Sequence, residues 1–300
     1  MKLMKKMIAA LTLTGLLAAS LGLSAFADDA ANVATLTEQQ VTKHLVMAES
    51  LDVPDAEFSF AVTAVTADAP AVTIGSISYS SADDKGTLST EGVYTVDKNA
   101  EITFGTFPHA GTYEYTVTET TGSAEGITYD STSYTMTVYV ANGSDGALAV
   151  QRIIVEADNG KQYELSFTNT YCKNGSLTIT KNTEGDLADK TKDFAFTITF
   201  IKSGTESDSV TSYTGKIGEE PIECTIGQET SFYLHDGESL VFDDLPVGTR
   251  YVVTEVAAAD GYTPSVSVIE NGVQTVTNNT TAEANALSTA NAGFSNLVGE

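Results

Sequence analysis

Two sets of a lysine, a glutamate and an asparagine occur along the chain with similar spacing. The sets are Lys43, Glu119 and Asn169, and then Lys181, Glu255 and Asn296. The lysine and the glutamate are 76 residues apart in the first set and 74 in the second, and the asparagine follows 50 and 41 residues later. A neutral lysine amine can attack a carboxamide carbon and release ammonia, while a nearby glutamic acid polarises the carboxamide carbonyl and relays protons. These residue types therefore predict two intramolecular Lys-Asn isopeptide bonds, promoted by Glu119 and Glu255.

The alternation of side chains around each set predicts that its polar members face the protein interior, because residues two positions apart in a strand share a face. The runs that share a face are Val41, Lys43 and Leu45; Tyr115, Val117 and Glu119; Leu165, Phe167 and Asn169; Leu177, Ile179 and Lys181; Tyr251, Val253 and Glu255; and Phe294, Asn296 and Val298. Burial raises the pKa of a carboxyl group and lowers that of an amine, which leaves a buried lysine neutral and nucleophilic. A fold that holds the reactants together supplies effective molarities of about 10⁵ M or more.

An unreactive arrangement of the same residues is the alternative. A buried Lys-Glu ion pair, with the asparagine capping a turn, would also satisfy the polar groups. The recurrence of the whole set in the same apolar register favours the condensation. For the second set, Asn291 is a fallback to Asn296, although no aromatic residue stands two positions before it.

Short segments with strand periodicity make up the sequence from Asp28 onward. Thr, Val, Tyr, Phe and Ile alternate with polar residues in segments such as 134–140 and 194–200. Asn142-Gly143 and Asn159-Gly160 are typical of hairpin turns. The pattern predicts an all-β fold of antiparallel sandwiches with almost no helix.

The two halves of the chain also resemble each other. The segment 107–119 matches 245–255, and the Phe-Thr-Asn at 167–169 matches the Phe-Ser-Asn at 294–296. This repeat predicts two homologous domains, at 28–172 and 173–300, with the boundary near Tyr171 to Asn174.

Composition excludes several classes of protein. Forty acidic and fifteen basic residues give a formal net charge of −25, which repels phosphate backbones, so nucleic-acid binding is excluded. The histidines and cysteines lack metal-ligand spacing, and no phosphate-binding loop or hydrolytic triad occurs, so no metal or cofactor is expected. Whether Cys172 and Cys224 form a disulfide stays open at this point.

The N-terminus has the features of a secretory signal peptide. Three lysines in the first six residues precede an apolar run over 7–23, and Ala25 and Ala27 fit a signal peptidase, so we expect cleavage after Ala27. The alternative is an N-terminal membrane anchor. No LPxTG-like sorting motif occurs near Glu300, which leaves a truncated sequence and a released protein as the two interpretations.

At this level of detail the chain resembles a known family. The two sets, with GTYEYTVTETTGSAEGITYDSTSYTMTVYV in the first half and KDFAFTITF and DGESLVFDDLPVGTRYVVTEV in the second, are similar to the two-domain major (backbone) pilins of Gram-positive cocci, the streptococcal pilin isopeptide-linkage domain family. The resemblance implies two tandem Ig-like antiparallel β-sandwich domains, each with a self-formed Lys-Asn isopeptide bond. It also implies that Tyr115 and Phe167 form a dry wall around the first set.

The function implied by this resemblance is that of a structural backbone subunit of a sortase-assembled pilus, or fimbrium, at the cell surface or cell wall. Such a protein is not an enzyme, because each bond forms once. Its partners would be other pilin subunits and a class C sortase, with a host-surface ligand left unspecified. The alternative is an adhesive accessory pilin or matrix-binding surface protein built from the same domains.

A polymerisation lysine is also implied, near the last strand of the first domain. Lys161 occupies about that place, directly after Asn159-Gly160. The alternative is a solvated lysine that follows a hairpin turn.

Overall fold

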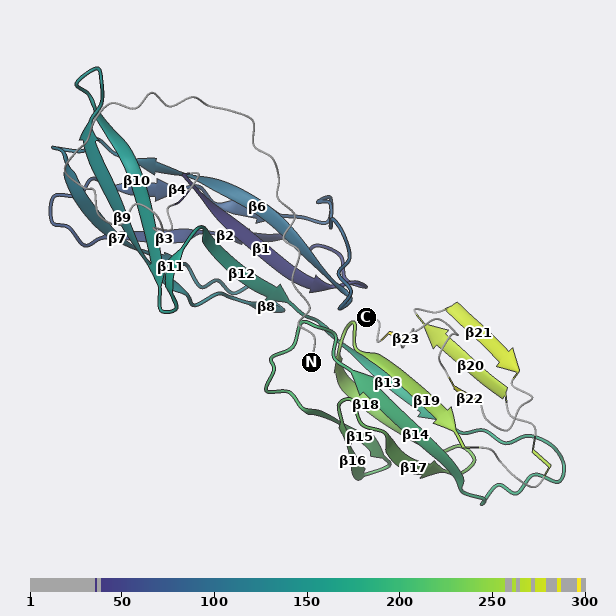
Figure 1. Cartoon of the computed structure of the whole chain (residues 1–300). Helices are drawn as coiled ribbons and strands as arrows, with labels where there is room; N and C mark the ends of the chain where they lie inside the picture. Colours follow the sequence, from purple (N-terminus) through teal and green to yellow (C-terminus); the bar gives the residue numbers. More distant parts are fainter. Residues whose placement is uncertain are drawn as a thin grey trace, which may run out of the picture. The chain divides into compact units, whose positions relative to one another are not determined.

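The computed structural model describes residues 36, 39–256, 261–262, 265–270, 273–278, 285–286 and 296–297, with the backbone alone from residue 268 onward. Every helix or strand element in this part of the chain is a β-strand, which confirms the all-β prediction (Figure 1). The predicted signal peptide at 1–27 lies outside the described residues. A search of the described residues for a helix able to span a bilayer finds none.

The strands up to residue 171 form two five-stranded sheets and one small ribbon. One sheet has the order β4-β6-β1-β12-β8 and the other has the order β11-β10-β9-β7-β3. The first consists of β1 (Gln40–Ala48), β4 (Val72–Ile74), β6 (Val93–Phe104), β8 (Ile127–Thr128) and β12 (Leu165–Tyr171). The second consists of β3 (Phe60–Ala64), β7 (Gly111–Glu119), β9 (Ser133–Asn142), β10 (Leu148–Ala157) and β11 (Gly160–Gln162). The ribbon pairs β2 (Ala56–Phe58) with β5 (Ile77–Tyr79).

These two five-stranded sheets pack over a shared apolar core, because each strand turns alternate side chains inward. The core residues come from both sheets and include Val41, Leu165 and Phe167 from one and Tyr113, Met136 and Val138 from the other. The burial of alternate residues along β9 is regular, with Tyr134, Met136, Val138 and Val140 buried. The predicted strand at 134–140 therefore lies within β9 and supplies one wall of the core.

The strands that begin and end this first half of the described chain are neighbours. β1 pairs with β12 in parallel, and Lys43 is the Cα partner of Phe167 and Leu45 that of Asn169. Partners in such a pair point to the same face of the sheet, so the lysine and the asparagine both face the core. The two strands are more than a hundred residues apart in the sequence, and the order of the strands in this sheet makes them neighbours.

The strands from residue 174 onward form two further sheets. One has the order β13-β18-β15-β16, and the other has the order β17-β14-β19-β22, with β23 also paired to β19. The first consists of β13 (Asn174–Thr180), β15 (Ser212–Ile217), β16 (Glu220–Thr225) and β18 (Ser239–Pro246). The second consists of β14 (Phe194–Ile201), β17 (Thr230–Leu234), β19 (Arg250–Glu255), β22 (Asn285–Ala286) and β23 (Asn296–Leu297). A separate ribbon pairs β20 (Ser265–Glu270) with β21 (Val273–Asn278).

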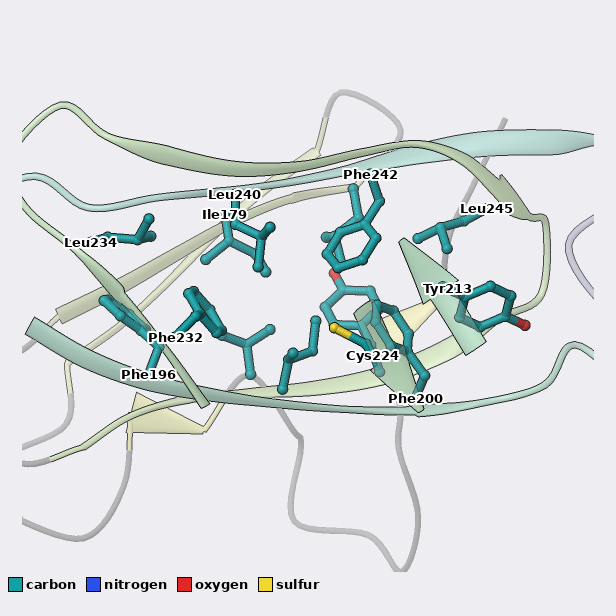
Figure 2. Packing of buried hydrophobic residues seen from close by; sticks show 14 of the residues in the cluster. Ile179, Phe196, Phe200, Tyr213, Cys224, Phe232, Leu234, Leu240, Phe242 and Leu245 are labelled. Atoms are coloured by element: carbon teal, nitrogen blue, oxygen red, sulfur yellow. The ribbon is translucent and has the colours of Figure 1, made fainter. Parts of the chain in front are cut away.

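Aromatic side chains fill the space between these two sheets. Figure 2 shows Phe200, Phe242 and their neighbours gathered between the strands, with Phe196 beside Phe232. The Phe200 and Phe242 rings meet edge to face at 5.0 Å, and the Phe196 and Phe232 rings stack at 5.4 Å. Such offset and edge contacts suit the quadrupoles of aromatic rings and fix how the sheets pack.

Both predicted hairpin turns join adjacent antiparallel strands. Asn142 is the last residue of β9, and Gly143 begins the loop to β10. Asn159 lies between β10 and β11, and Gly160 is the first residue of β11. Gly160 has a φ of 105°, a conformation that residues with a Cβ rarely adopt. This turn places the short strand β11 at the edge of its sheet.

Candidate functional site

Lys43 lies in the middle of β1 with its side chain completely buried. Its Nζ donates to the carbonyl oxygen of Phe167 at 3.1 Å and lies 3.2 Å from Glu119 Oε1. The ring of Phe58 covers the amine, with its centroid 5.0 Å from Nζ. Burial is the main influence on this group and lowers the pKa of Lys43, whereas the charge of Glu119 opposes the shift.

Glu119 is the last residue of β7, on the sheet opposite β1 and β12, and its side chain is also fully buried. Its Oε1 accepts from Asn169 Nδ2 at 3.1 Å, in addition to its contact with Lys43. One carboxylate oxygen therefore contacts both the amine that would attack and the amide nitrogen that would leave. The predicted set of Lys43, Glu119 and Asn169 comes together in one contact network.

Asn169 is completely buried on β12, and the hydrogen bonds around it fix the orientation of its carboxamide. Nδ2 donates to Glu119, and Oδ1 accepts from the main-chain N–H of Asp130 at 2.8 Å. A reversed carboxamide would place its N–H₂ against the N–H of Asp130 and its oxygen against a carboxylate. The expected polarisation of the carbonyl by Glu119 is thus replaced by a main-chain donor, while Glu119 contacts the leaving nitrogen.

Aromatic rings exclude water from this site. Phe167 is completely buried and packs against Phe60 and Tyr134, each with ring centroids 5.3 Å away. The ring that covers the Lys43 amine is Phe58, whereas Tyr115 packs near Phe104 and donates its hydroxyl to Pro70. The apolar surroundings explain why burial outweighs the carboxylate in setting the pKa of Lys43.

Asp130 and Phe58 are site residues that the sequence analysis missed. Asp130 contributes its main-chain N–H, a group that every residue except proline possesses, so the sequence does not reveal which residue supplies this donor. Phe58 precedes β3 on a separate ribbon, and its approach to Lys43 depends on how that ribbon packs. The sequence shows a phenylalanine 15 positions after Lys43, but nothing in the sequence indicates that the two side chains are in contact.

Lys181 and Glu255 form a second close pair. Lys181 follows β13, and its Nζ donates to Glu255 Oε1 at 2.6 Å, with the two side chains 13% and 7% exposed. The ring centroid of Phe194 lies 4.1 Å from the amine. This pair has the same residue types and the same aromatic cover as Lys43 and Glu119.

The side chain of Asn296 lies outside the described residues, as does Asn291. The backbone of Asn296 belongs to β23, where it is the Cα partner of Tyr251 on β19. The Cα partner of Glu255 is Asn285 on β22. Which asparagine meets Lys181 therefore stays a prediction.

Lys161 lies on β11, at the edge of its sheet, and its side chain is exposed. Its Cα partner on β10 is Glu156.

Cys172 and Cys224 are both free thiols, and Cys224 is completely buried in the apolar core between the later sheets. Within the described part of the chain, no cluster of three or more His, Cys, Asp or Glu side chains could hold a metal ion.

Comparison with known proteins finds relatives for most of the chain. Residues 39–172 match the Spy0128-like isopeptide containing domain, and residues 175–296 match a domain of unknown function, DUF7601. A pilin of Streptococcus pyogenes serotype M1 is 31% identical over 265 residues, which cover 81% of this chain and 75% of the pilin.

Two further proteins also match the chain. The major pilin protein T3.2 of Streptococcus pyogenes serotype GAS13637 is a solved structure with 25% sequence identity and a TM-score of 0.41, and the match covers 83% of this chain and 94% of that one. The pilus tip adhesin Cpa of Streptococcus pyogenes is 43% identical over 84 residues, which are 28% of this chain and 12% of the adhesin. The pilin match extends over both halves of the chain, whereas the adhesin match is confined to a small part. The chain belongs to the family of pilins that carry a Spy0128-like isopeptide domain, and it is a homologue of the major, or backbone, subunit of streptococcal pili.

Proposed function

We propose that Lys43 and Asn169 condense to an intramolecular isopeptide bond that stiffens this pilus backbone subunit. The observation that carries the proposal is the position of Glu119 Oε1, 3.2 Å from the Lys43 amine and 3.1 Å from the Asn169 amide nitrogen. Attacking and leaving nitrogens share one carboxylate oxygen in a site closed to solvent. Burial lowers the pKa of Lys43 and so increases its neutral, nucleophilic fraction.

The reaction balances without any other reagent. The lone pair of Lys43 Nζ attacks Asn169 Cγ, and the electron pair of the carbonyl moves onto Oδ1. A proton passes from Nζ through Glu119 Oε1 to Nδ2, the Cγ–Nδ2 bond breaks, and ammonia leaves as the carbonyl re-forms. Glu119 returns to its starting protonation state, and the reaction occurs once because both reactants are consumed.

The bond would carry tension past the sheets. Lys43 lies in β1, the first strand of this half of the chain, and Asn169 lies in β12, its parallel neighbour and the last strand of the same half. A pull on the chain before β1 and after β12 would pass through the Lys43 and Asn169 side chains. Residues 44–168 would then lie outside the loaded covalent path, which is the mechanical property that a pilus shaft needs.

A second bond of the same kind is proposed between Lys181 and Asn296, promoted by Glu255. It is supported by the 2.6 Å contact of Lys181 with Glu255 and by the ring of Phe194, whose centroid lies 4.1 Å from the lysine amine. The proposed organisation is a signal peptide at 1–27, an isopeptide domain at 28–172 and a second domain at 173–300. Export across the membrane would deliver the mature chain to the cell surface.

Assembly of the pilus is proposed to use a class C sortase that joins Lys161 of one subunit to the next subunit. Lys161 is exposed on the edge strand β11, where an enzyme could reach its amine. The partners are then other copies of the pilin and the sortase.

The intact mass of the secreted chain tests the self-formed bonds. We expect a mass lower than that of the mature sequence by two molecules of ammonia. Glu119→Ala should restore the mass of one ammonia, whereas Glu114→Ala, an exposed glutamate on the same strand, should not. A wild-type chain with the full sequence mass would overturn the proposal.

The second bond and the sortase linkage have their own tests. Asn296→Ala should restore the second ammonia, and Asn285→Ala and Asn291→Ala should not. Incubation of the chain, extended at its C-terminus by an LPxTG-type sorting motif, with the sortase should give a ladder of covalent oligomers. Lys161→Ala should abolish the ladder, and Lys216→Ala, at an exposed lysine on β15, should leave it intact. A ladder that persists in Lys161→Ala would move the linkage to another lysine.

A further inference from the structure

The carbonyl oxygen of Asn169 is the atom that must accept negative charge in the proposed condensation. Its hydrogen-bond donor is the main-chain N–H of Asp130, at 2.8 Å. The same N–H lies 3.0 Å from Glu119 Oε2. One main-chain donor therefore contacts both the group that reacts and the group that transfers the proton.

The side chain of Asp130 holds this donor in place. Its Oδ1 accepts from the N–H of Thr132 at 2.8 Å, which closes the local turn. Its Oδ2 accepts from the N–H of Thr168 at 2.7 Å, on β12 and directly before Asn169. The carboxylate thus fastens the loop after β8 to the strand that carries the reacting carboxamide.

We infer that the Asp130 N–H is the oxyanion donor of the condensation and that the Asp130 carboxylate positions it. This inference rests on the proposed Lys43-Asn169 bond. When Lys43 Nζ attacks Cγ, the electron pair of the carbonyl moves onto Oδ1, and the charge develops at the atom that the N–H already contacts. A donor that is fixed before the reaction stabilises such a charge without reorganisation.

Sharing of the N–H between two acceptors suits this role. Before attack, the carboxylate oxygen Glu119 Oε2 competes with Asn169 Oδ1 for the proton of the N–H. When Glu119 takes up the proton from Lys43, its oxygens become weaker acceptors, and Oδ1 becomes a stronger one. The hydrogen bond therefore strengthens at Oδ1 as the transition state is approached, which is the differential stabilisation that lowers a barrier.

The experiment removes the N–H and keeps the side chain. Asp130 is replaced by its α-hydroxy acid during cell-free translation of the mature chain, which converts the N–H to an ester oxygen. After a short labelling pulse, samples are quenched at intervals, and the cross-linked 43–169 peptide is measured by mass spectrometry. The control carries the same replacement at Asp158, which is exposed in the turn between β10 and β11.

We expect the ester at 130 to slow formation of the cross-link by roughly 100-fold, the effect of losing one oxyanion donor, and the ester at 158 to leave the rate unchanged. Resistance to thermolysin, compared with that of Lys43→Ala, reports whether the first half is folded without the bond. Cross-linking at the wild-type rate in the folded 130 ester would overturn the assignment. A wild-type chain that never loses ammonia would instead overturn the proposed bond, and with it this inference.

A second pair of variants applies even if the ester prevents folding. Asp130→Ala retains the N–H but loses both contacts of the carboxylate, and Asp130→Asn retains an oxygen acceptor for Thr132. We expect the rates to fall in the order wild type, Asp130→Asn, Asp130→Ala, because partial anchoring restores part of the donor geometry. Equal rates in all three would overturn the positioning role of the carboxylate.

Discussion

Breaking the proposed bond at Asn169 should reduce the stability of the first half of the chain by a calculable amount. Asn169→Ala prevents the bond and leaves Lys43 hydrogen-bonded to Phe167 and close to Glu119. Lys43→Met prevents it from the other side. The two variants lose different local contacts but share the loss of the cross-link, so their common effect measures the bond.

The magnitude follows from the length of chain that the bond closes. Lys43 and Asn169 are 126 residues apart, from 169 minus 43. The chain-entropy relation for cross-links gives about 5 kcal/mol for a loop of this length, mainly from the restricted unfolded state. For a domain of this size, such a loss lowers the melting temperature by roughly 15 °C.

Thermal unfolding followed by circular dichroism, with intact mass to confirm the state of the bond, measures this difference. Asn99→Ala, at an exposed asparagine on β6, serves as the matched control and should melt with the wild type. The transition of the second half of the chain provides an internal reference. If both variants lack the bond and yet melt within about 3 °C of the cross-linked wild type, the loop-closure argument is wrong.

Three further outcomes are expected. In Asn169→Ala, burial lowers the pKa of the Lys43 amine, so the unfolded state binds more protons than the folded state, and the free energy of unfolding should rise as the pH increases toward 10.5. Urea titrations at a series of pH values should show this slope, and the double variant Asn169→Ala/Lys43→Met should lack it. Phe58→Ala should destabilise the fold by about 3–5 kcal/mol and slow cross-linking in pulse-labelled samples, because it opens the cover of the amine; an unchanged rate would argue against desolvation as the activating effect. Glu255→Ala should leave Lys181 uncross-linked while the first bond still forms, as peptide mapping by mass spectrometry would show; loss of both bonds would mean that the two sites are not independent.

Several features of this protein could be read from local sequence patterns. Alternation of period two predicted that Lys43, Glu119 and Asn169 face inward, and all three are buried. This works because a strand fixes which face each side chain occupies, whatever the strand pairs with. The turn residues at Asn159-Gly160 likewise marked a hairpin, because the turn requires a backbone conformation that glycine adopts readily.

Other features of the first site depend on the tertiary structure. The parallel pairing of β1 with β12 brings together segments whose separation along the chain has no local signature. The donor at Asn169 Oδ1 is a main-chain N–H of Asp130, and the cover over Lys43 is Phe58, from a ribbon outside the main sheets. Whether Cys172 and Cys224 form a disulfide likewise depends on their separation in the folded chain, where both are free thiols.

The sequence by itself thus determined the reactive residue types, their inward orientation and the all-β architecture, since these depend on side-chain chemistry and strand geometry. The tertiary structure decided which oxygen of Glu119 contacts the two nitrogens and which main-chain group contacts Asn169. These contacts depend on the order of the strands in the sheets and on the path of the loops between them. Main-chain groups are common to nearly all residues, so the identity of the residue that supplies one is invisible until the chain is folded.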